Sequence, residues 1–82
     1  MHLEIITPDK TIFKGEVDSA TFPGTKGSFQ VLKNHAAIIS TLEEGKVLYK
    51  INDNISEVMV SGGVVEVLHN NIILLASGII QE

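Results

Sequence analysis

Residues 46–77 read KVLYKINDNISEVMVSGGVVEVLHNNIILLAS, and this stretch decides the fold class. Short runs rich in Val, Ile and Leu alternate with turn-forming residues, NDN at 52–54, GG at 62–63 and NN at 70–71. Apolar runs separated by turn signals at intervals of about eight to twelve residues are typical of the strands of a β-sandwich or barrel. The stretch therefore predicts four strands joined by tight turns, which favour antiparallel pairing.

The first half of the chain continues the same pattern. It predicts strands at residues 2–6 (HLEII), 11–22 (TIFKGEVDSATF), 28–32 (SFQVL) and 37–42 (AIISTL). In the long second run, Gly15 predicts a bulge or a sharp bend. A helix over residues 36–44 is the alternative to the last strand, but Ile, Ser and Thr are weak helix formers and Gly45 follows closely. We therefore predict an all-β protein.

Length and composition limit the function classes. With 82 residues the chain has room for one core, so residues 1–82 are predicted to form one domain. Cysteine is absent, which excludes disulfides and thiolate metal sites. Six Lys and Arg against ten Asp and Glu disfavour nucleic acid as a partner. No targeting segment or long apolar run is present, so we expect a cytoplasmic chain that begins near Met1.

The histidines are the first candidates for chemistry. His2, His35 and His69 could in principle hold a zinc ion together with a water molecule, but their spacing matches no metal-binding motif. Ser28 or Ser61 beside His35 would likewise be a nucleophile and base without a recognisable motif. We therefore predict solvated or packed histidines and no metal site.

Two glycine-containing segments are candidates for anion binding. FPGTKG, residues 22–27, lacks the spacing of a phosphate-binding loop and precedes no helix. SGG, residues 61–63, could offer backbone N–H groups, but paired glycines between two strands more often permit a bulge or a close backbone approach. The glutamates form no recognisable acid–base pair. The sequence therefore predicts no catalytic residue, no cofactor and no small-molecule substrate.

The order and separation of three segments resemble a known family. F-x-G at Phe13 to Gly15, FPGTKGSFQVLKNHAAIISTLEEGKV at 22–47 and VSGGVVEVLHNNIILLAS at 60–77 are similar to the epsilon subunit of F-type ATP synthases. The resemblance implies a roughly ten-stranded antiparallel β-sandwich. It also implies a non-catalytic rotor subunit of the central stalk, which links the gamma subunit to the c-ring and transmits rotation driven by protons or sodium ions. The location implied is peripheral, on the cytoplasmic face of the bacterial inner membrane.

The resemblance also implies two docking surfaces. The residues expected to face the c-ring are Gly24, Thr25, Lys26, Gly27, Ser28, Phe29 and Gln30. Those expected to face gamma are Thr7, His35 and Ala36, with Thr7 on a strand adjacent to the His35 region. The sequence departs from the family pattern at four positions, where Gly, Pro-Gly and Pro are replaced by Gln30, Lys33-Asn34 and Ala37.

Most members of this family continue into a C-terminal pair of regulatory helices, whereas this sequence ends at Glu82. We therefore expect that the chain neither binds ATP nor inhibits ATP hydrolysis by itself. Two other classes stay open. A free-standing ligand-binding sandwich would need a concave apolar pocket with a few polar groups, and a hydrolase would need an essential Ser, His or Glu.

Overall fold

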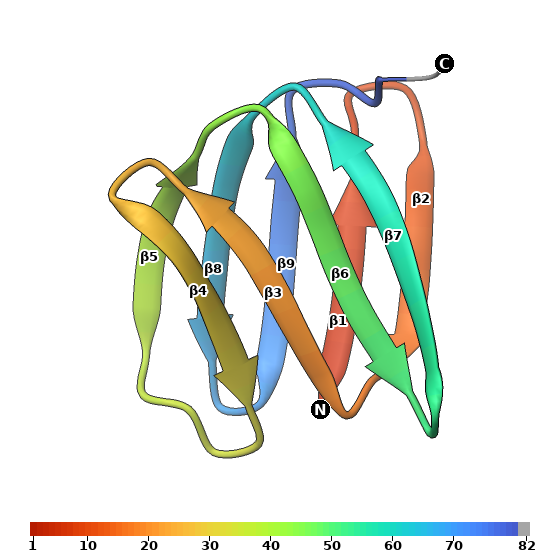
Figure 1. The fold of residues 1–82 in the computed structure, drawn as a ribbon, viewed down its shortest axis with the longest axis vertical. Helices are drawn as coiled ribbons and strands as arrows, with labels where there is room; N and C mark the ends of the chain where they lie inside the picture. Colours follow the sequence, from red (N-terminus) through yellow and green to blue (C-terminus); the bar gives the residue numbers. More distant parts are fainter. Residues whose placement is uncertain (81–82) are drawn as a thin grey trace.

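The computed structural model describes residues 1–80, and within this range the regular structure consists of strands (Figure 1). The nine strands are β1 (His2–Ile6), β2 (Thr11–Glu16), β3 (Ser19–Gly24), β4 (Gly27–Leu32), β5 (Ile38–Leu42), β6 (Gly45–Ile51), β7 (Asn54–Val60), β8 (Gly63–Leu68) and β9 (Asn71–Ala76). The all-β prediction is confirmed, and the alternative helix over 36–44 is wrong because β5 occupies it. Among these residues there is no helix that could span a membrane. The chain end at Glu82 lies outside the described residues.

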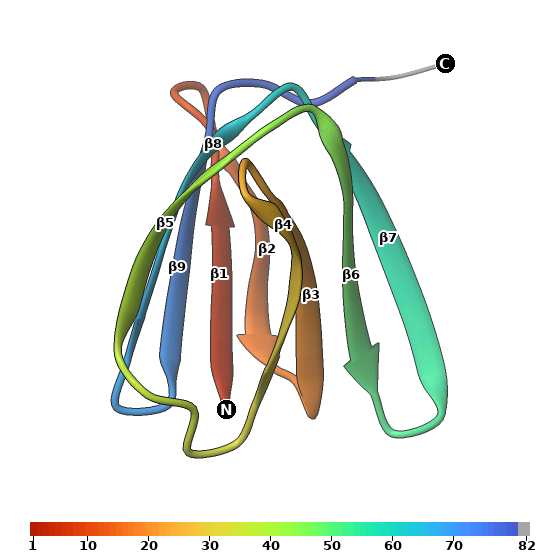
Figure 2. The same ribbon diagram turned by 60° about the vertical axis from the view of Figure 1, so that its left-hand side comes forward.

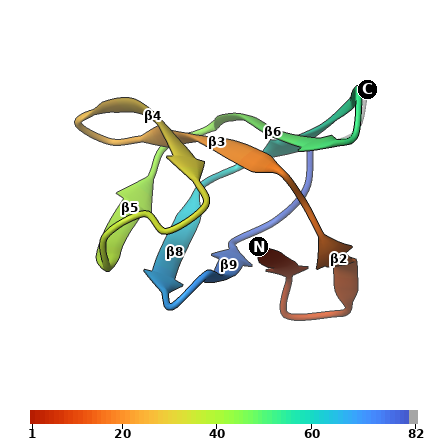
Figure 3. The same ribbon diagram turned by 90° about the horizontal axis from the view of Figure 1, so that it is seen from below.

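The strands form one curled sheet that folds into two layers (Figures 2 and 3). One layer has the order β2-β1-β9-β8-β5, and the other has the order β4-β3-β6-β7. A single pair, Gly24 with Leu42, joins β3 to β5 at one corner. At another corner Val60 at the end of β7 pairs with Ile79, so the segment after β9 also connects the layers.

Two features differ from the sequence prediction. The predicted strand over 11–22 is two strands, because the chain crosses between the layers at Val17 and Asp18, where the Asp18 N–H donates to the Lys50 carbonyl at 2.7 Å. The pairing of β1 with β9 is parallel, whereas all other named strand pairs are antiparallel. A parallel pair needs a long connection, and the chain from β2 to β8 supplies it.

Gly15 lies in regular register opposite Leu3, so the predicted bulge is not there; the register shifts instead between Ile5 and Ile6. A Cβ atom at Gly15 would approach the Phe13 ring to 3.2 Å, so the glycine leaves room for that ring. The Phe13 ring also contacts Tyr49 on the opposite layer, with ring centroids 4.4 Å apart. The F-x-G segment thus helps to close one side of the sandwich.

The core lies between the layers and contains only apolar side chains of moderate size. Strand β9 shows how the core forms. Its apolar run from Ile72 to Ala76 is continuous in the sequence, but its side chains alternate in the structure, with Ile72 and Leu74 fully buried and Leu75 exposed. The buried apolar residues are Leu3, Ile5, Val17, Ala20, Phe22, Val31, Leu42, Val47, Val60, Val65, Val67, Ile72, Leu74 and Ala76. The apolar alternation within VVEVLH, residues 64–69, and IILLAS, residues 72–77, predicts that Val67 and Leu74 face the core, and their burial confirms this prediction.

The turn between β8 and β9 sits one residue earlier than the predicted Asn-Asn turn. His69 and Asn70 have φ angles of 49° and 61°, the left-handed conformation that a two-residue hairpin turn of the primed type requires at both positions. At the other end of β8, Gly63 has a φ of 152°, and a Cβ atom there would collide with the Leu75 carbonyl. The glycine at this position permits the close approach of β8 and β9.

Substitutions of two adjacent leucines can test which side of β9 faces the core. Leu74→Ala should lower the free energy of unfolding by about 2–4 kcal/mol, because it leaves a cavity in the core. Leu75→Ala, whose side chain is 56% exposed, should lower it by less than about 1 kcal/mol. Urea unfolding of both variants measures the difference. Equal losses would contradict the assigned orientation of β9.

Candidate protein-docking surfaces

The first candidate surface is the tip of the β3–β4 hairpin, which holds the residues expected to face the c-ring. Gly24 and Gly27 are paired across the turn, and Gly27 has a φ of 129°. Residues 25–28 are exposed, whereas Gly24 is buried and Phe29 is half-buried, with its ring centroid 5.7 Å from that of Phe22. Gln30 lies farther down β4 on the outer side of its layer. The tip itself is therefore residues 25–28.

Contacts with β5 hold this tip in place. The Thr25 N–H donates to the Thr41 carbonyl at 3.1 Å, and the hydroxyl oxygens of the two threonines are 2.8 Å apart. The Glu43 N–H donates to the Pro23 carbonyl at 2.9 Å. The Lys26 side chain is exposed. The hairpin thus presents a small polar projection on a fixed base.

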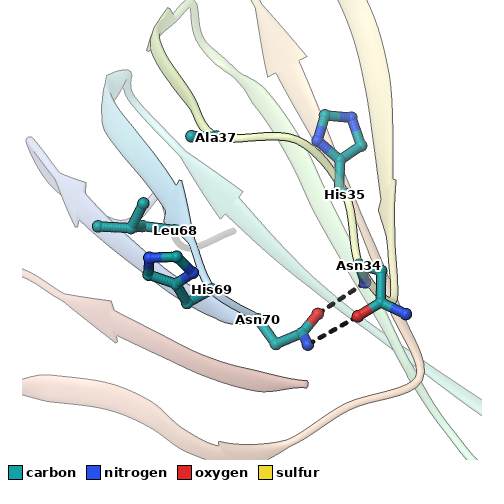
Figure 4. A pocket seen from close by; sticks show the side chains of 6 residues that line it. All are labelled: Asn34, His35, Ala37, Leu68, His69 and Asn70. Atoms are coloured by element: carbon teal, nitrogen blue, oxygen red, sulfur yellow. Dashed lines mark hydrogen bonds between the residues drawn. The ribbon is translucent and has the colours of Figure 1, made fainter.

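The second candidate surface is the loop between β4 and β5, which contains His35 and Ala36. It lies beside the β8–β9 turn, and the two form a shallow hollow (Figure 4). The residues lining the hollow are Asn34, His35, Ala37, Leu68, His69 and Asn70. His35 and His69 thus border one hollow, although they are far apart in the sequence.

An asparagine pair holds the loop against the turn. The Asn34 backbone N–H donates to Asn70 Oδ1 at 2.7 Å, and Asn70 Nδ2 donates to Asn34 Oδ1 at 3.1 Å (Figure 4). Asn34 has a φ of 67°, a conformation that Gly and Asn adopt most readily. This explains how Asn34 can stand where the family pattern has glycine.

The imidazole of His35 is also oriented locally. Its Nδ1 lies 2.7 Å from the Ala36 carbonyl oxygen, which only accepts, so Nδ1 carries a proton. In the neutral ring Nε2 is then the remaining acceptor. Ala36 itself is exposed.

Thr7, the third residue expected to face gamma, is not near His35. Thr7 directly follows β1 and lies beside Ser77 and Gly78, which follow β9. The β1–β2 turn and the loop between β4 and β5, which carries His35, are at opposite ends of the molecule (Figures 1 and 2). The Thr7 hydroxyl donates to the Lys10 carbonyl at 3.1 Å, within the turn that follows β1. The expected adjacency of Thr7 and the His35 region is therefore wrong, because they occupy opposite ends of one layer.

Between these two ends lies a surface that the sequence analysis missed. On the outer side of the β2-β1-β9-β8-β5 layer, Val64 pairs with Leu75, and Leu75 pairs with Ile6. Leu68 continues this surface to the edge of the His35 hollow. We define this apolar face by its exposed or half-exposed apolar members, which are Ile6, Ile39, Val64, Leu68, Ile73 and Leu75.

The outer side of the other layer is more polar. Thr21, Gln30 and Lys50 share it with Leu48 and Ile55. Lys46 and Glu57 form an ion pair across β6 and β7 at 3.9 Å. Five large apolar side chains are exposed on the first outer side (Ile39, Val64, Leu68, Ile73 and Leu75), whereas Leu32 and Ile55 are exposed on the second. The apolar face is therefore the third candidate docking surface.

The described residues 1–80 contain no group of three or more acidic or histidine side chains that could hold a metal ion. The hollows on the surface of this part of the chain are shallow and open. Two layers of strands with extended outer surfaces define the class: a small β-sandwich domain.

Comparisons with known sequences identify the family within this class. The family model described as "ATP synthase, Delta/Epsilon chain, beta-sandwich domain" matches residues 1–82. The ATP synthase epsilon chain of Nitratidesulfovibrio vulgaris is 43% identical over 93% of this chain and 57% of its own length. That of Chlorobaculum tepidum is 43% identical over 89% of this chain and 84% of its own length. The chain belongs to the delta/epsilon family of ATP synthase. It spans less than two-thirds of the length of most of the curated relatives that it matches here.

Solved structures show the same fold. A chain of the mitochondrial ATP synthase of Euglena gracilis superposes with a TM-score of 0.88 at 21% identity, over 95% of this chain and 51% of that chain. A chain in the central stalk and c-ring structure of the Tetrahymena thermophila mitochondrial ATP synthase gives 0.83 at 15% identity, over 98% and 65%. At these identities the likeness establishes the β-sandwich fold.

Two variants of Asn34 separate its backbone role from its side-chain role. Asn34→Gly keeps the left-handed conformation and the backbone donor to Asn70, so the free energy of unfolding should fall by no more than about 1 kcal/mol. Asn34→Ala adds the strain of a left-handed alanine and should cost about 1 kcal/mol more than Asn34→Gly. Denaturant titrations measure both values. A glycine variant less stable than the alanine variant would contradict this assignment.

Proposed function

We propose that this chain is the β-sandwich part of a non-catalytic rotor subunit in the central stalk of a proton- or sodium-driven F-type ATP synthase. It links the gamma subunit to the c-ring and transmits rotation between them. Family membership supports the assignment to this enzyme complex. The observation that carries the docking role is the apolar face, because a rotor subunit needs extended surfaces for neighbours and no reaction site.

The gamma subunit is the proposed partner of the apolar face. The residues first expected to face gamma, Thr7 and His35, lie at the two ends of this face, and Leu68 connects it to the His35 hollow. A partner that reaches both ends must also cover the apolar side chains between them. Burial of these side chains would supply the hydrophobic contribution to binding that exposed loops alone lack.

The c-ring is the proposed partner of the β3–β4 tip. The tip projects from the sandwich, its residues 25–28 are exposed, and its base is fixed to β5 by the Thr25–Thr41 contact. A polar projection suits the polar loops of a membrane ring better than the apolar face does. The complex would place the chain peripherally, at the cytoplasmic face of the bacterial inner membrane.

The docking of gamma can be tested with two matched double variants. Ile39→Thr with Leu75→Thr removes apolar surface from the apolar face at side chains that are 71% and 56% exposed. We expect this variant to bind purified gamma at least about tenfold more weakly, since tenfold corresponds to 1.4 kcal/mol and two truncations in an interface core reach that value. Threonine preserves the preference for strand, so folding should be retained.

The control carries the same changes outside the apolar face. Ile55→Thr with Leu32→Thr alters side chains that are 68% and 54% exposed and lie on β7 and β4 of the other layer. Its affinity for gamma, measured by calorimetry, should stay within about twofold of the original. An equal loss in both double variants, or none in either, would rule out the apolar face as the gamma site.

The c-ring contact can be tested by adding bulk at the hairpin tip. Lys26→Trp places a large side chain at an exposed tip position, so assembly with a gamma and c-ring complex should fall while thermal stability stays unchanged. Asp53→Trp, in the exposed β6–β7 turn, is the matched control. Co-sedimentation with reconstituted c-ring measures assembly. Normal assembly of a folded Lys26→Trp chain would show that the tip does not contact the ring.

A further inference from the structure

Glu66 is the acidic residue of the SGGxxEV segment, and the structure places it in the middle of the apolar face. It lies on β8, opposite Ile39 of β5 on one side and opposite Ile73 of β9 on the other. The next residue in this row is Glu4 on β1, which is opposite Lys14 on β2. Glu66 is thus a carboxylate with an apolar neighbour on each adjacent strand.

Glu66 also lacks a charged or hydrogen-bonding partner among residues 1–80. Other carboxylates on the strands do have partners: Glu16 lies 3.3 Å from His2, and Glu57 lies 3.9 Å from Lys46. In the free chain the exposed Glu66 carboxylate is hydrated. Any partner that covers the apolar face removes this water.

Two shallow hollows lie on either side of Glu66. One is formed with Ala37, Ile38, Ile39, Val67 and Leu68, and the other with Ile39, Val64, Ile73 and Leu75. Both hollows have predominantly apolar linings, and Glu66 borders each of them. Apolar side chains of a partner that enter both hollows would therefore enclose the carboxylate between them.

A carboxylate that loses its water without gaining a partner strongly opposes binding. We propose that Glu66 determines specificity at the apolar face by pairing with a Lys or Arg of the docking partner. On the partner, this basic residue lies between two apolar side chains, and each of these fills one of the two hollows. This inference rests on the proposed function, in which the partner is gamma. To that function it adds the kinds of side chain on gamma that contact the apolar face: one basic residue with an apolar residue on each side.

The direction in which one substitution changes the affinity for gamma distinguishes this proposal from a purely apolar contact. Glu66→Leu adds apolar surface, so a purely apolar interface would bind gamma more tightly after the change. If a basic side chain lies opposite, that cation loses its partner, and binding should weaken at least about tenfold. Glu66→Gln, which keeps the size of the side chain and removes its charge, should weaken binding in the same direction.

The measurement is calorimetric titration of the full 82-residue chain with the gamma subunit of the same organism. Circular dichroism and sedimentation establish that each variant is folded and monomeric, and Glu66→Gln replaces Glu66→Leu if the leucine variant self-associates. Glu57→Leu and Glu57→Gln, on the outer side of the other layer, are the matched controls and should leave the affinity within about twofold.

A charge exchange then identifies the partner residue. Glu66→Lys should abolish detectable binding, and one Lys→Glu or Arg→Glu substitution on gamma should restore it to within about tenfold of the original affinity. Binding of Glu66→Leu and Glu66→Gln that is equal to or tighter than the original would overturn the proposal while leaving the gamma assignment intact. Failure of the unaltered chain to bind gamma would instead overturn the proposed function.

Discussion

The packing of the two layers against each other is the interaction on which every surface of this domain depends. The chain has no disulfide and no tryptophan, so the space between the layers is filled mainly by Val, Leu and Ile, with Phe22 as the one fully buried aromatic residue in the described range. Phe13 and Tyr49 meet across the layers at one side, and Gly15 leaves room for the Phe13 ring. A core of this size leaves little surplus stability, so the strands must keep the register that fills it. Since side chains alternate along a strand, the same register dictates which of them face outward.

That register leaves apolar side chains on the outer side of the β2-β1-β9-β8-β5 layer. Side chains alternate along a strand, so in a run such as the one from Ile72 to Leu75 every second apolar residue must point away from the core. The parallel pairing of β1 with β9 then brings Ile6 beside Leu75, so that the apolar face extends across the four neighbouring strands β1, β9, β8 and β5. Glu66 keeps this face partly polar in the free chain. The same carboxylate makes the face selective, in our proposal, for a partner that supplies a cation.

The loop that carries His35 has a defined conformation although it lacks the glycine and prolines of the family pattern. Asn34 adopts the left-handed conformation that glycine would otherwise supply, and its amide pairs with that of Asn70. In the family pattern prolines restrict the backbone of this loop. Here the contact between Asn34 and Asn70 restricts it instead. The contact ties the loop to the β8–β9 turn, so the hollow between them has a defined shape.

The sequence alone determined the all-β class, most strand positions, the inward orientation of Val67 and Leu74, and the family, because these depend on local alternation, turn residues and the order of short segments. It did not reveal the crossing at Val17 and Asp18 or the parallel β1–β9 pair, since both depend on how the layers close. It also placed Thr7 beside His35, although a whole strand length separates the two ends they occupy. The apolar face was missed for the same reason: its members come from β1, β5, β8 and β9, and only the tertiary pairing of these strands brings them together.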